Sequence, residues 1–372
     1  MPDRTLFLTL RIFSATGGIE KVSRSVGKAL YELSKEQPGS SLQVMSMYDK
    51  LADLDEKYFP ATVFGGFGED KLRFMSAAIK KGMNSDVVIL SHINLLLAGY
   101  IIKLFSPKTR LILLAHGVEI WGRLPAMKNI MLKKCDQVVA VSRFTQDKVV
   151  VIHGVSPAKC VVLNNCLDPF LPVPQSLDKD AALMQRYGLQ PQDIVLITLT
   201  RLSSREQYKG YDNVLQSLFE IKKTTPNIKY LVIGKYDTLE KQRIDNIITS
   251  LDLQQQVIFA GFIPEEEVGA HYSIADIYIM PSKKEGFGIV FIEAMYYGKP
   301  VIAGNKDGSV DALHNGKFGL LVDPDNLDEI TAAITKVIND TAAYVPQRQT
   351  VMDKFSYPVY KDNLRKILLM SR

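Results

Sequence analysis

The sequence predicts an α/β protein of two domains, each a doubly wound parallel sheet. Runs of Val, Ile and Leu alternate with segments of helical spacing in both halves of the chain, and this pattern is typical of parallel sheets covered by helices on both faces. The length of 372 residues exceeds what one hydrophobic core usually serves. Three prolines within residues 168–174 mark a stiff connector. We therefore place a first domain over residues 1–170 and a second over residues 171–354.

Each half carries five segments that predict buried strands. In the first half these are residues 5–12, 42–47, 87–90, 111–115 and 137–141. In the second half they are residues 194–199, 229–233, 257–260, 277–280 and 300–303. Apolar residues recur at helical spacing in the segments between them, for example at residues 19–33 and 72–81, and again near the end at residues 357–369.

Composition narrows the class of protein. The chain is 47% hydrophobic and 23% charged, which is ordinary for a globular enzyme. Its three cysteines form no CxxC pair, which favours a reducing compartment without structural zinc. No leader segment is visible, and the longest apolar stretch, residues 87–100, is too short and too polar to span a bilayer. We expect a cytoplasmic protein.

The positive charge is concentrated in the first half of the chain. Residues 1–170 hold 22 Lys and Arg against 15 Asp and Glu, whereas residues 171–372 hold 23 against 25. A membrane surface or a lipid-diphosphate acceptor would suit this basic half. Residues 71–81 predict a basic amphipathic helix that lies either on anionic lipid or against the core with a solvated basic face. Nucleic acid is not an expected partner, because interleaved aromatic residues and known binding motifs are missing from the basic half.

Two glutamates flank a glycine turn at the most informative point of the sequence. Glu285 follows the predicted strand 277–280, and Glu293 lies about two turns into a helix that begins near Ile289. Ligands of open parallel sheets bind at the carboxyl ends of the strands. A helix N-terminus there offers N–H groups to an anion, and a carboxylate can accept from a pair of sugar hydroxyls. The pattern indicates a site for a phosphorylated sugar.

The string around Glu285 and Glu293 resembles the E-x7-E motif of the GT-B retaining glycosyltransferases of family 4, also called glycosyl transferases group 1. The resemblance covers nearly the whole chain. It implies two Rossmann-like domains facing across a cleft, with the acceptor on the first, the nucleotide sugar on the second, and a final helix, about residues 355–372, packed back on the first. Glu285 would face the sugar hydroxyls and Glu293 the ribose. Backbone groups of the turn would help to hold sugar or phosphate, at Phe287, Gly288, Ile289 and Val290.

Two cations resemble another element of the family. Arg201 follows the predicted strand 194–199, and Lys209 precedes a glycine, as in the family's G-R-L and K-G pair. A departing nucleoside diphosphate gains negative charge, which a fixed Arg and Lys would stabilise. Thr200 stands where the family usually has Gly, which leaves the backbone geometry at that point open.

First-domain candidates also come from the resemblance. Gly17 and Gly18 resemble the family's G-G-I-E loop, which lies over the donor phosphates beside the acceptor. His116 resembles the histidine that reaches the donor sugar near its anomeric centre, where it would position a hydroxyl. We interpret the other four histidines as structural. Residues 305–313, with Asp311, are candidates for sugar-side or structural positions.

The sequence predicts no bound metal and no cofactor besides the nucleotide sugar. Asp-x-Asp triplets occur, but none follows a strand in a donor-like setting. We predict a retaining, metal-independent hexosyltransferase that uses a UDP- or GDP-sugar. Its acceptor would be a saccharide or polyprenol-linked saccharide in surface polysaccharide or glycolipid biosynthesis, with possible peripheral contact at the inner face of the membrane. The alternatives are a phosphorylase-like GT-B enzyme and a catalytically silent partner that binds nucleotide sugar.

Overall fold

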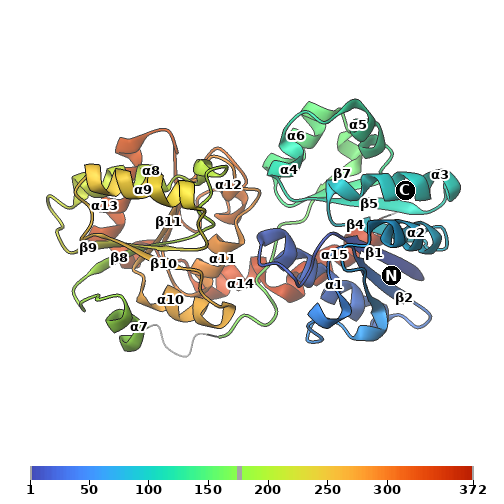
Figure 1. Ribbon diagram of the computed structural model, residues 1–372, viewed down its shortest axis with the longest axis horizontal. Coiled ribbons are helices and arrows are strands. Elements are labelled where there is room, and N and C mark those ends of the chain that lie inside the picture. Colours follow the sequence, from blue (N-terminus) through green and yellow to red (C-terminus); the bar gives the residue numbers. More distant parts are fainter. Residues whose placement is uncertain (1, 174–177, 371–372) are drawn as a thin grey trace. The chain divides into compact units, whose positions relative to one another are not determined.

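The computed structural model describes residues 2–173 and 178–370, which form two compact units. The first unit comprises the chain up to Pro169 together with the segment from Phe355 onward, and the second comprises Phe170–Lys354. Each unit is a sheet with helices on both faces (Figure 1). Pro174 of the predicted connector and the last two residues of the predicted C-terminal segment lie outside the described residues.

The first unit contains a seven-stranded parallel sheet in the order β3-β2-β1-β4-β5-β6-β7. Its strands are β1 (Arg4–Thr9), β2 (Ser41–Ser46), β3 (Phe64–Gly66), β4 (Val87–Leu90), β5 (Arg110–Ala115), β6 (Gln137–Ala140) and β7 (Cys160–Val162). Strands β4, β5 and β6 are buried throughout, as expected when helices cover both faces of a sheet.

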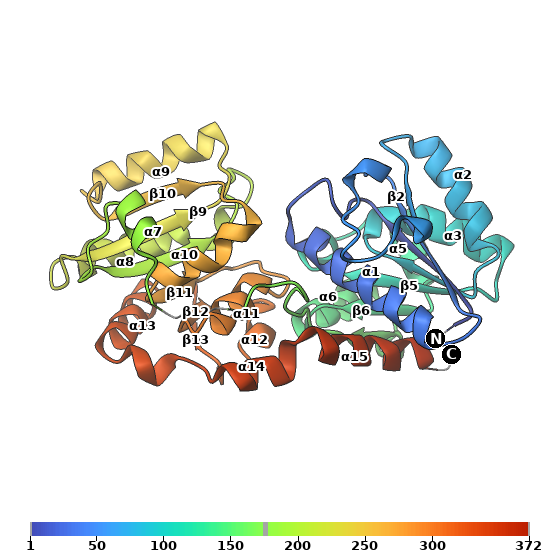
Figure 2. The same cartoon turned by 90° about the horizontal axis from the view of Figure 1, so that it is seen from below.

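Helices on one face of this sheet share an apolar cluster with β1, β4 and β5. They are α2 (Lys71–Gly82), α3 (Leu96–Phe105), α4 (Val118–Trp121), α5 (Ala126–Lys133) and α6 (Arg143–His153). The opposite face carries α1 (Gly18–Glu36) and α15 (Tyr357–Leu369), which lie side by side in Figure 2. Ion pairs join these two helices, with Lys361 Nζ 3.0 Å from Glu32 and Arg365 2.6 Å from Glu36.

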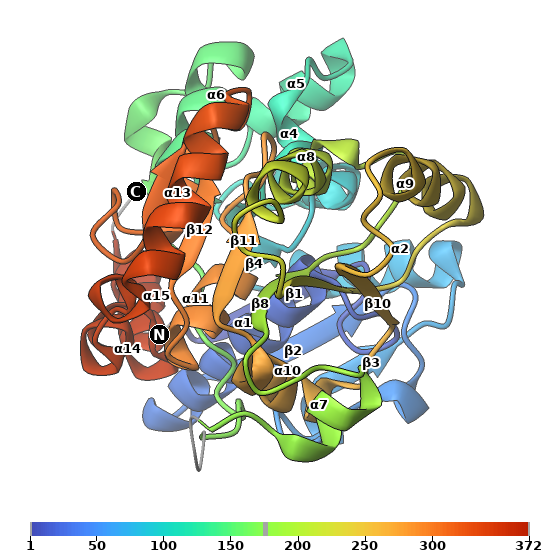
Figure 3. The ribbon, with the colours of Figure 1, turned by 90° about the vertical axis from the view of Figure 1, so that its left-hand side faces the viewer.

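The second unit contains a six-stranded parallel sheet in the order β10-β9-β8-β11-β12-β13. Its strands are β8 (Ile194–Leu199), β9 (Ile228–Ile233), β10 (Val257–Gly261), β11 (Ile277–Met280), β12 (Val301–Gly304) and β13 (Leu320–Val322). Its helices are α7 (Ala181–Arg186), α8 (Tyr211–Ile221), α9 (Thr238–Ser250), α10 (Val268–Ile274), α11 (Ile289–Tyr296), α12 (Ser309–Ala312), α13 (Leu327–Asn339) and α14 (Arg348–Phe355). In Figure 3, α8, α9 and α13 lie over one face of the sheet, and α7 and α10 over the other.

The predicted fold class is confirmed, and all ten predicted strands are present within a few residues of their expected bounds. The first prediction is too long, because the strand ends at Thr9 and the following backbone turns to the Asp49 carboxylate. That carboxylate accepts from the N–H groups of Ile12 at 2.6 Å and Ser14 at 2.8 Å. The prediction also missed three edge strands of three residues each, at β3, β7 and β13.

The strand order of each sheet reverses direction beside its first strand. In the second unit, β8 pairs with β9 on one side and β11 on the other. In the first unit, β1 pairs with β2 and β4. Ligands of doubly wound sheets bind at such a switch point, outside the carboxyl ends of the strands. The loops that follow β8 and β11, and those that follow β1 and β4, are therefore where each unit is expected to meet a ligand.

Candidate active site

An ion pair joins the loops that follow β8 and β11. Lys209 ends a short 3-10 turn, η5 (Gln207–Lys209), and its Nζ lies 2.6 Å from Oε2 of Glu285. The two side chains are mostly buried, with 15% and 19% of their surfaces exposed. Burial alone would lower the pKa of Lys209, but the charge and hydrogen bond of Glu285 outweigh it and raise that pKa. A permanent cation therefore stands at the ligand-binding edge of the sheet.

Contacts from the loop after β12 fix the backbone at Glu285. The N–H of Glu285 donates to Asp307 Oδ2 at 2.7 Å, and the N–H of Gly308 donates to the carbonyl oxygen of Glu285 at 2.8 Å. The other oxygen of Asp307 accepts from the N–H of Ser309 at 2.9 Å, and Asp307 is only 1% exposed. A Cβ at Gly308 would overlap the carbonyl oxygen of Gly286, so the close approach of the two loops requires glycine.

Arg201 follows β8 and directs its guanidinium toward Glu206. Its Nε donates to Glu206 Oε2 at 3.3 Å, and its Nη2 contacts Oε1 of the same carboxylate. Thr200 precedes it with ordinary backbone geometry, and its N–H donates to the carbonyl oxygen of Ile233 at 2.9 Å. The backbone of Gly234 lies close to that of Thr200, because a Cβ at Gly234 would overlap the carbonyl oxygen of Thr200. The glycine at this close approach is therefore Gly234 and not residue 200.

The predicted glycine turn leads into α11 as expected. Gly288 precedes the helix with φ of +85°, a conformation that favours glycine. The first N–H groups of a helix have no intrahelical acceptor, so Ile289 and Val290 present theirs at the sheet edge. Phe287 is buried, and Glu293 is completely buried within the helix. The hydroxyl of Tyr272 donates to Glu293 Oε2 at 3.4 Å, and burial together with this carboxylate raises the pKa of Tyr272 well above its usual range.

The carboxyl edge of the first unit's sheet carries Gly17 and Gly18. They begin α1, with Gly17 as the residue before its first turn. A Cβ at Gly17 would overlap the Glu20 carboxylate, whereas one at Gly18 would meet open space. The buried Asp49 carboxylate holds the preceding backbone, as described above, and so fixes the loop from which both glycines emerge.

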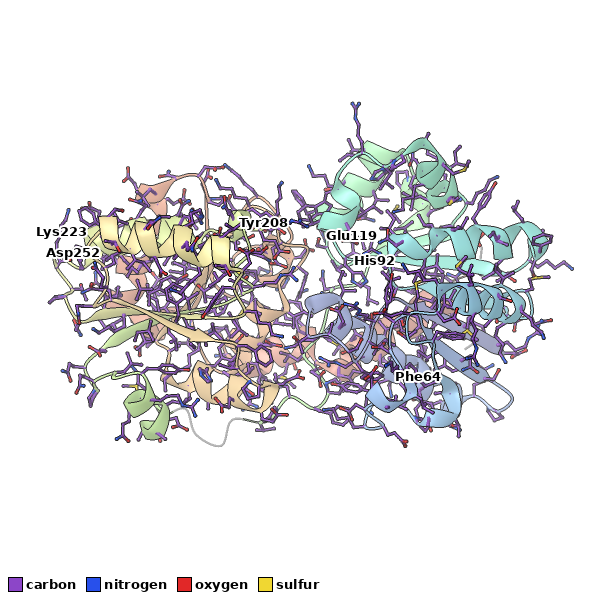
Figure 4. All side chains as sticks on the ribbon, in the orientation of Figure 1. Phe64, His92, Glu119, Tyr208, Lys223 and Asp252 are labelled. Atoms are coloured by element: carbon purple, nitrogen blue, oxygen red, sulfur yellow. The ribbon has the colours of Figure 1, made fainter. Side chains whose placement is uncertain are left out.

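A histidine cluster lies at the ends of β4 and β5. Nε2 of His116 is 2.7 Å from the carbonyl oxygen of Ser91, which can only accept, so Nε2 carries a proton, and in the tautomer with this single proton Nδ1 is an acceptor. The N–H of His116 donates to Glu119 Oε1 at 2.6 Å. His92 lies close to Glu119 (Figure 4), and burial lowers the pKa of His92 to about 4. Nδ1 of His92 accepts from the N–H of Asn94 at 3.0 Å, consistent with the structural role predicted for it.

Comparison with known proteins identifies the family. The model of Glycosyltransferase Family 4 matches residues 44–169, and that of Glycosyl transferases group 1 matches residues 180–354. A GDP-mannose-dependent alpha-(1-6)-phosphatidylinositol monomannoside mannosyltransferase from Mycolicibacterium smegmatis is 30% identical over 275 residues, which are 70% of each chain. This chain belongs to glycosyltransferase family 4. The predicted resemblance is thereby confirmed.

Other similar proteins extend the comparison. An alpha-monoglucosyldiacylglycerol synthase from Acholeplasma laidlawii is 24% identical over 194 residues, which are 52% of this chain and 48% of that one. The crystal structure of HepE from Anabaena in complex with UDP superimposes with a TM-score of 0.80 over 98% of this chain and 99% of that one, at 19% identity. That likeness shows the GT-B fold. Family membership makes the chain a hexosyltransferase that uses a nucleotide-sugar donor.

The structure of this glycosyltransferase brings some predicted site residues together. Lys209 and Glu285 are in direct contact, and Arg201 belongs to the same loop as Lys209. Glu293 and the turn that holds Phe287 lie on the element that follows Glu285. Candidates in the first unit occupy the edge of their own sheet. They are Gly17, Gly18 and His116.

Sequence reasoning missed several residues that hold the candidate site in place. Asp307 fixes the backbone of Glu285, Asp49 fixes the loop before Gly17, and Glu206 pairs with Arg201. A signal for Asp307 was present, because a carboxylate one residue before a glycine in the loop after β12 is in position to accept backbone N–H groups. The contact itself joins residues 22 positions apart and depends on how two loops meet.

Protonation of Asp307 is expected to couple stability to pH. Burial, assisted by the Glu285 charge and opposed by the Ser309 hydrogen bonds, raises the pKa of Asp307 from 3.8 to about 7. Because the folded pKa exceeds the unfolded one, the folded state binds this proton more tightly. Stability from this group is therefore greatest below pH 4 and falls by up to about 1.4 kcal/mol per pH unit until pH 7.

Thermal unfolding of the wild type and of the Asp307→Asn variant, whose side chain cannot titrate, tests this expectation. Between pH 5 and pH 7.5 the wild-type protein should lose stability relative to the variant in thermal unfolding. Parallel stability curves across this range would contradict the raised pKa. Asp245→Asn, at a partly exposed position on α9, is the control for a general effect of lost charge.

Acidic triplets of the chain serve local roles in the structure. Asp323 and Asp325 both pair with Lys306, at 2.6 and 2.8 Å, and Asp180 caps α7. In the part of the chain that the structure describes, no group of three or more His, Cys, Asp or Glu side chains is placed to hold a metal ion.

Proposed function

We propose that this glycosyltransferase moves a hexose, with retention of configuration, from a UDP- or GDP-sugar to a lipid-linked saccharide in surface polysaccharide or glycolipid biosynthesis. The observation that carries the donor assignment is the buried Lys209–Glu285 pair beside the N-terminus of α11. It places a cation for the phosphate and a carboxylate for the sugar at the edge where a doubly wound sheet binds its ligand. It also argues against a catalytically silent partner, which has no need of a charge pair at that position.

In this proposal the second unit holds the donor. Arg201 and Lys209 bind the diphosphate, and Glu293 accepts from the ribose hydroxyls. Glu285 accepts from hydroxyls of the hexose, while backbone N–H groups of the turn support sugar or phosphate. As the bond from the anomeric carbon to the phosphate oxygen breaks, the two cations stabilise the charge that grows on the leaving diphosphate. No metal ion is needed for that role.

The first unit supplies the acceptor side. Gly17 and Gly18 let the backbone approach the donor phosphates and the acceptor, and Nδ1 of His116 accepts from a sugar hydroxyl. The acceptor oxygen attacks the anomeric carbon on the face that the diphosphate leaves, and its proton passes to a leaving phosphate oxygen. Products are the glycosylated acceptor and a nucleoside diphosphate, so no enzyme nucleophile is required.

Titration calorimetry with UDP, GDP and ADP tests the donor site. Wild-type protein is expected to bind one nucleotide, and Glu293→Gln is expected to weaken that binding about tenfold to a hundredfold, since hydrogen bonds to a charged acceptor contribute about 1.5–3 kcal/mol. Glu220→Gln, an exposed carboxylate on α8, is the matched control. If the folded wild-type protein binds none of the three nucleotides, the donor-site assignment is wrong and a phosphorylase-like activity becomes the favoured function.

Contact with a membrane is proposed for the helical face of the first unit. Met75 and Ile79 of α2 pack against the core, which favours the core-facing interpretation of that side of the helix. Leu72 on α2 is 85% exposed, and Met127 and Ile130 on α5 are 60% and 49% exposed. The exposed cations beside them are Lys71, Arg73, Lys80, Lys81, Arg123, Lys133 and Lys134. Apolar side chains within a basic surface suit anionic lipid. In the described ranges, no helix combines the length and apolar character needed to cross a bilayer.

Vesicle sedimentation tests this surface. We expect binding to vesicles with anionic phosphatidylglycerol but not to neutral phosphatidylcholine vesicles, with affinity falling as salt rises. Lys80→Glu with Lys81→Glu should reduce binding at least tenfold, since each basic residue contributes about 1 kcal/mol. The control pair is Lys317→Glu with Lys366→Glu, both at exposed positions outside α2 and α5. Equal loss in the two pairs would show only a dependence on net charge.

A further inference from the structure

Each cation proposed to bind the donor diphosphate already has a carboxylate partner in this structure. Lys209 pairs with Glu285, and Arg201 pairs with Glu206. The two pairs differ in burial. Lys209 and Glu285 are 15% and 19% exposed, whereas the side chain of Arg201 is 68% exposed and that of Glu206 is 21% exposed. Separating Lys209 from Glu285 costs much free energy, because each charge would be left desolvated. Arg201 is exposed, so its pair with Glu206 resembles a surface ion pair, which contributes about 0–1 kcal/mol.

The Arg201–Glu206 contact uses the geometry by which Arg binds phosphate. Nε and Nη2 of Arg201 face the two carboxylate oxygens of Glu206, with Nε 3.3 Å from Oε2. A guanidinium presents the same pair of N–H groups to a carboxylate and to a phosphate. Glu206 therefore occupies the N–H groups of Arg201 that a diphosphate would need.

The carboxylate is the fixed member of the pair. The N–H of Glu206 donates to the carbonyl oxygen of Ser203 at 2.7 Å, and its own carbonyl oxygen accepts from the N–H of Lys209 at 3.2 Å. The loop is anchored further by Ser204, whose N–H donates to Asp237 Oδ2 at 2.8 Å. Arg201 has a long, exposed side chain, so it is the member that can turn to another anion.

We propose that Glu206 is an internal counter-ion that holds Arg201 while the donor is absent, and that the donor diphosphate takes Arg201 from it. This inference rests on the proposed donor site. The exchange makes binding selective for ligands whose charge exceeds that of one carboxylate, so a nucleoside diphosphate competes well and a single weak anion does not. It also helps product release, because Glu206 recaptures Arg201 as the nucleoside diphosphate leaves.

An alternative role for Glu206 predicts the opposite change in nucleotide affinity when its charge is removed. If Glu206 remained bonded to Arg201 and merely aimed it at the phosphate, removing its charge would weaken nucleotide binding. If Glu206 competes with the phosphate, removing its charge strengthens binding. Glu206→Gln keeps the size of the side chain and changes only the charge, so it separates the two roles.

The test is calorimetry of UDP, GDP and ADP binding to wild type, Glu206→Gln, Arg201→Ala and the double variant. We expect Glu206→Gln to bind the cognate nucleotide about threefold to fivefold more tightly, which is the strength of an exposed ion pair. In the Arg201→Ala background the same substitution should have no effect. Glu220→Gln, which removes a negative charge elsewhere in the second unit, corrects for net charge.

The calorimetric results decide whether Glu206 competes with the diphosphate for Arg201. Unchanged or weaker binding by Glu206→Gln, measured against Glu220→Gln, overturns the inference but leaves the donor site intact. A gain that persists without Arg201 also overturns it, because the effect would then not pass through that residue. Failure of the wild-type protein to bind any of the three nucleotides overturns the donor site and this inference together. Matching thermal transitions establish that the variants are folded.

Discussion

Replacing Lys209 with methionine is expected to lower kcat/KM by two to three orders of magnitude. Methionine keeps most of the length of the side chain and removes its charge. In the proposed function this charge stabilises a leaving diphosphate in the transition state, and the loss of one such group typically costs 10²–10³ in rate. A second effect adds to the first, because Glu285 would lose its partner 2.6 Å away while remaining mostly buried. The loss should appear mainly in kcat.

Initial rates of donor consumption, measured with the nucleotide sugar whose base calorimetry selects, give the test. Lys241→Met is the matched control, since Lys241 pairs with Asp245 on the partly exposed surface of α9. Its rate should stay within a factor of two of the wild type. A Lys209→Met enzyme that retained more than a tenth of wild-type kcat/KM would contradict the assignment of this lysine to the leaving group.

The rival explanation is that Lys209→Met merely unfolds the loop. Lys209→Met combined with Glu285→Gln removes both charges and restores electrostatic balance, so it should recover the thermal stability lost in the single variant. Activity should not return with it. Recovery of both properties together would mean that the ion pair only holds the loop.

The sequence predicted the main strands because their signal is local. Val87–Leu90, Ile194–Leu199 and Ile277–Met280 match their predicted bounds, since continuous apolar runs of this kind occur where both faces of a sheet are covered. The short edge strand β3 (Phe64–Gly66) contains two glycines and has no such run. It forms because its backbone pairs with β2 across a register that no local pattern shows.

Site residues were predictable to the extent that chemistry and position in a motif decide them. Lys209 and Glu285 were both named from motifs, but their 2.6 Å contact joins residues 76 positions apart. The contacts of Asp307 and Glu206 depend on the path of loops and on which donors those loops leave facing a carboxylate. Sequence patterns thus named the groups that we propose to meet the donor. They did not reveal the residues that hold those groups in place.

Gly210, which follows Lys209, shows how strongly the backbone constrains the site. Its φ is +85°, and an added Cβ would overlap the carbonyl oxygen of Pro281 in the loop before Glu285. Gly188 has a similar φ of +63°, but a Cβ there would meet nothing within 4 Å. The two glycines therefore separate the cost of a left-handed backbone from the cost of steric overlap.

Gly188→Ala is expected to cost about 1 kcal/mol, for the backbone conformation alone. Gly210→Ala should cost about 3 kcal/mol or more, because the chain at Pro281 must also move. For a unit of this size we expect Tm to fall by about 2–4 °C in the first variant and by at least about 6 °C in the second. Because the same movement separates Lys209 from Glu285, only Gly210→Ala should also lose nucleotide affinity. Equal Tm shifts with intact affinity in both variants would mean that the two loops accommodate the extra carbon. Gly210 would then be required only for its positive φ.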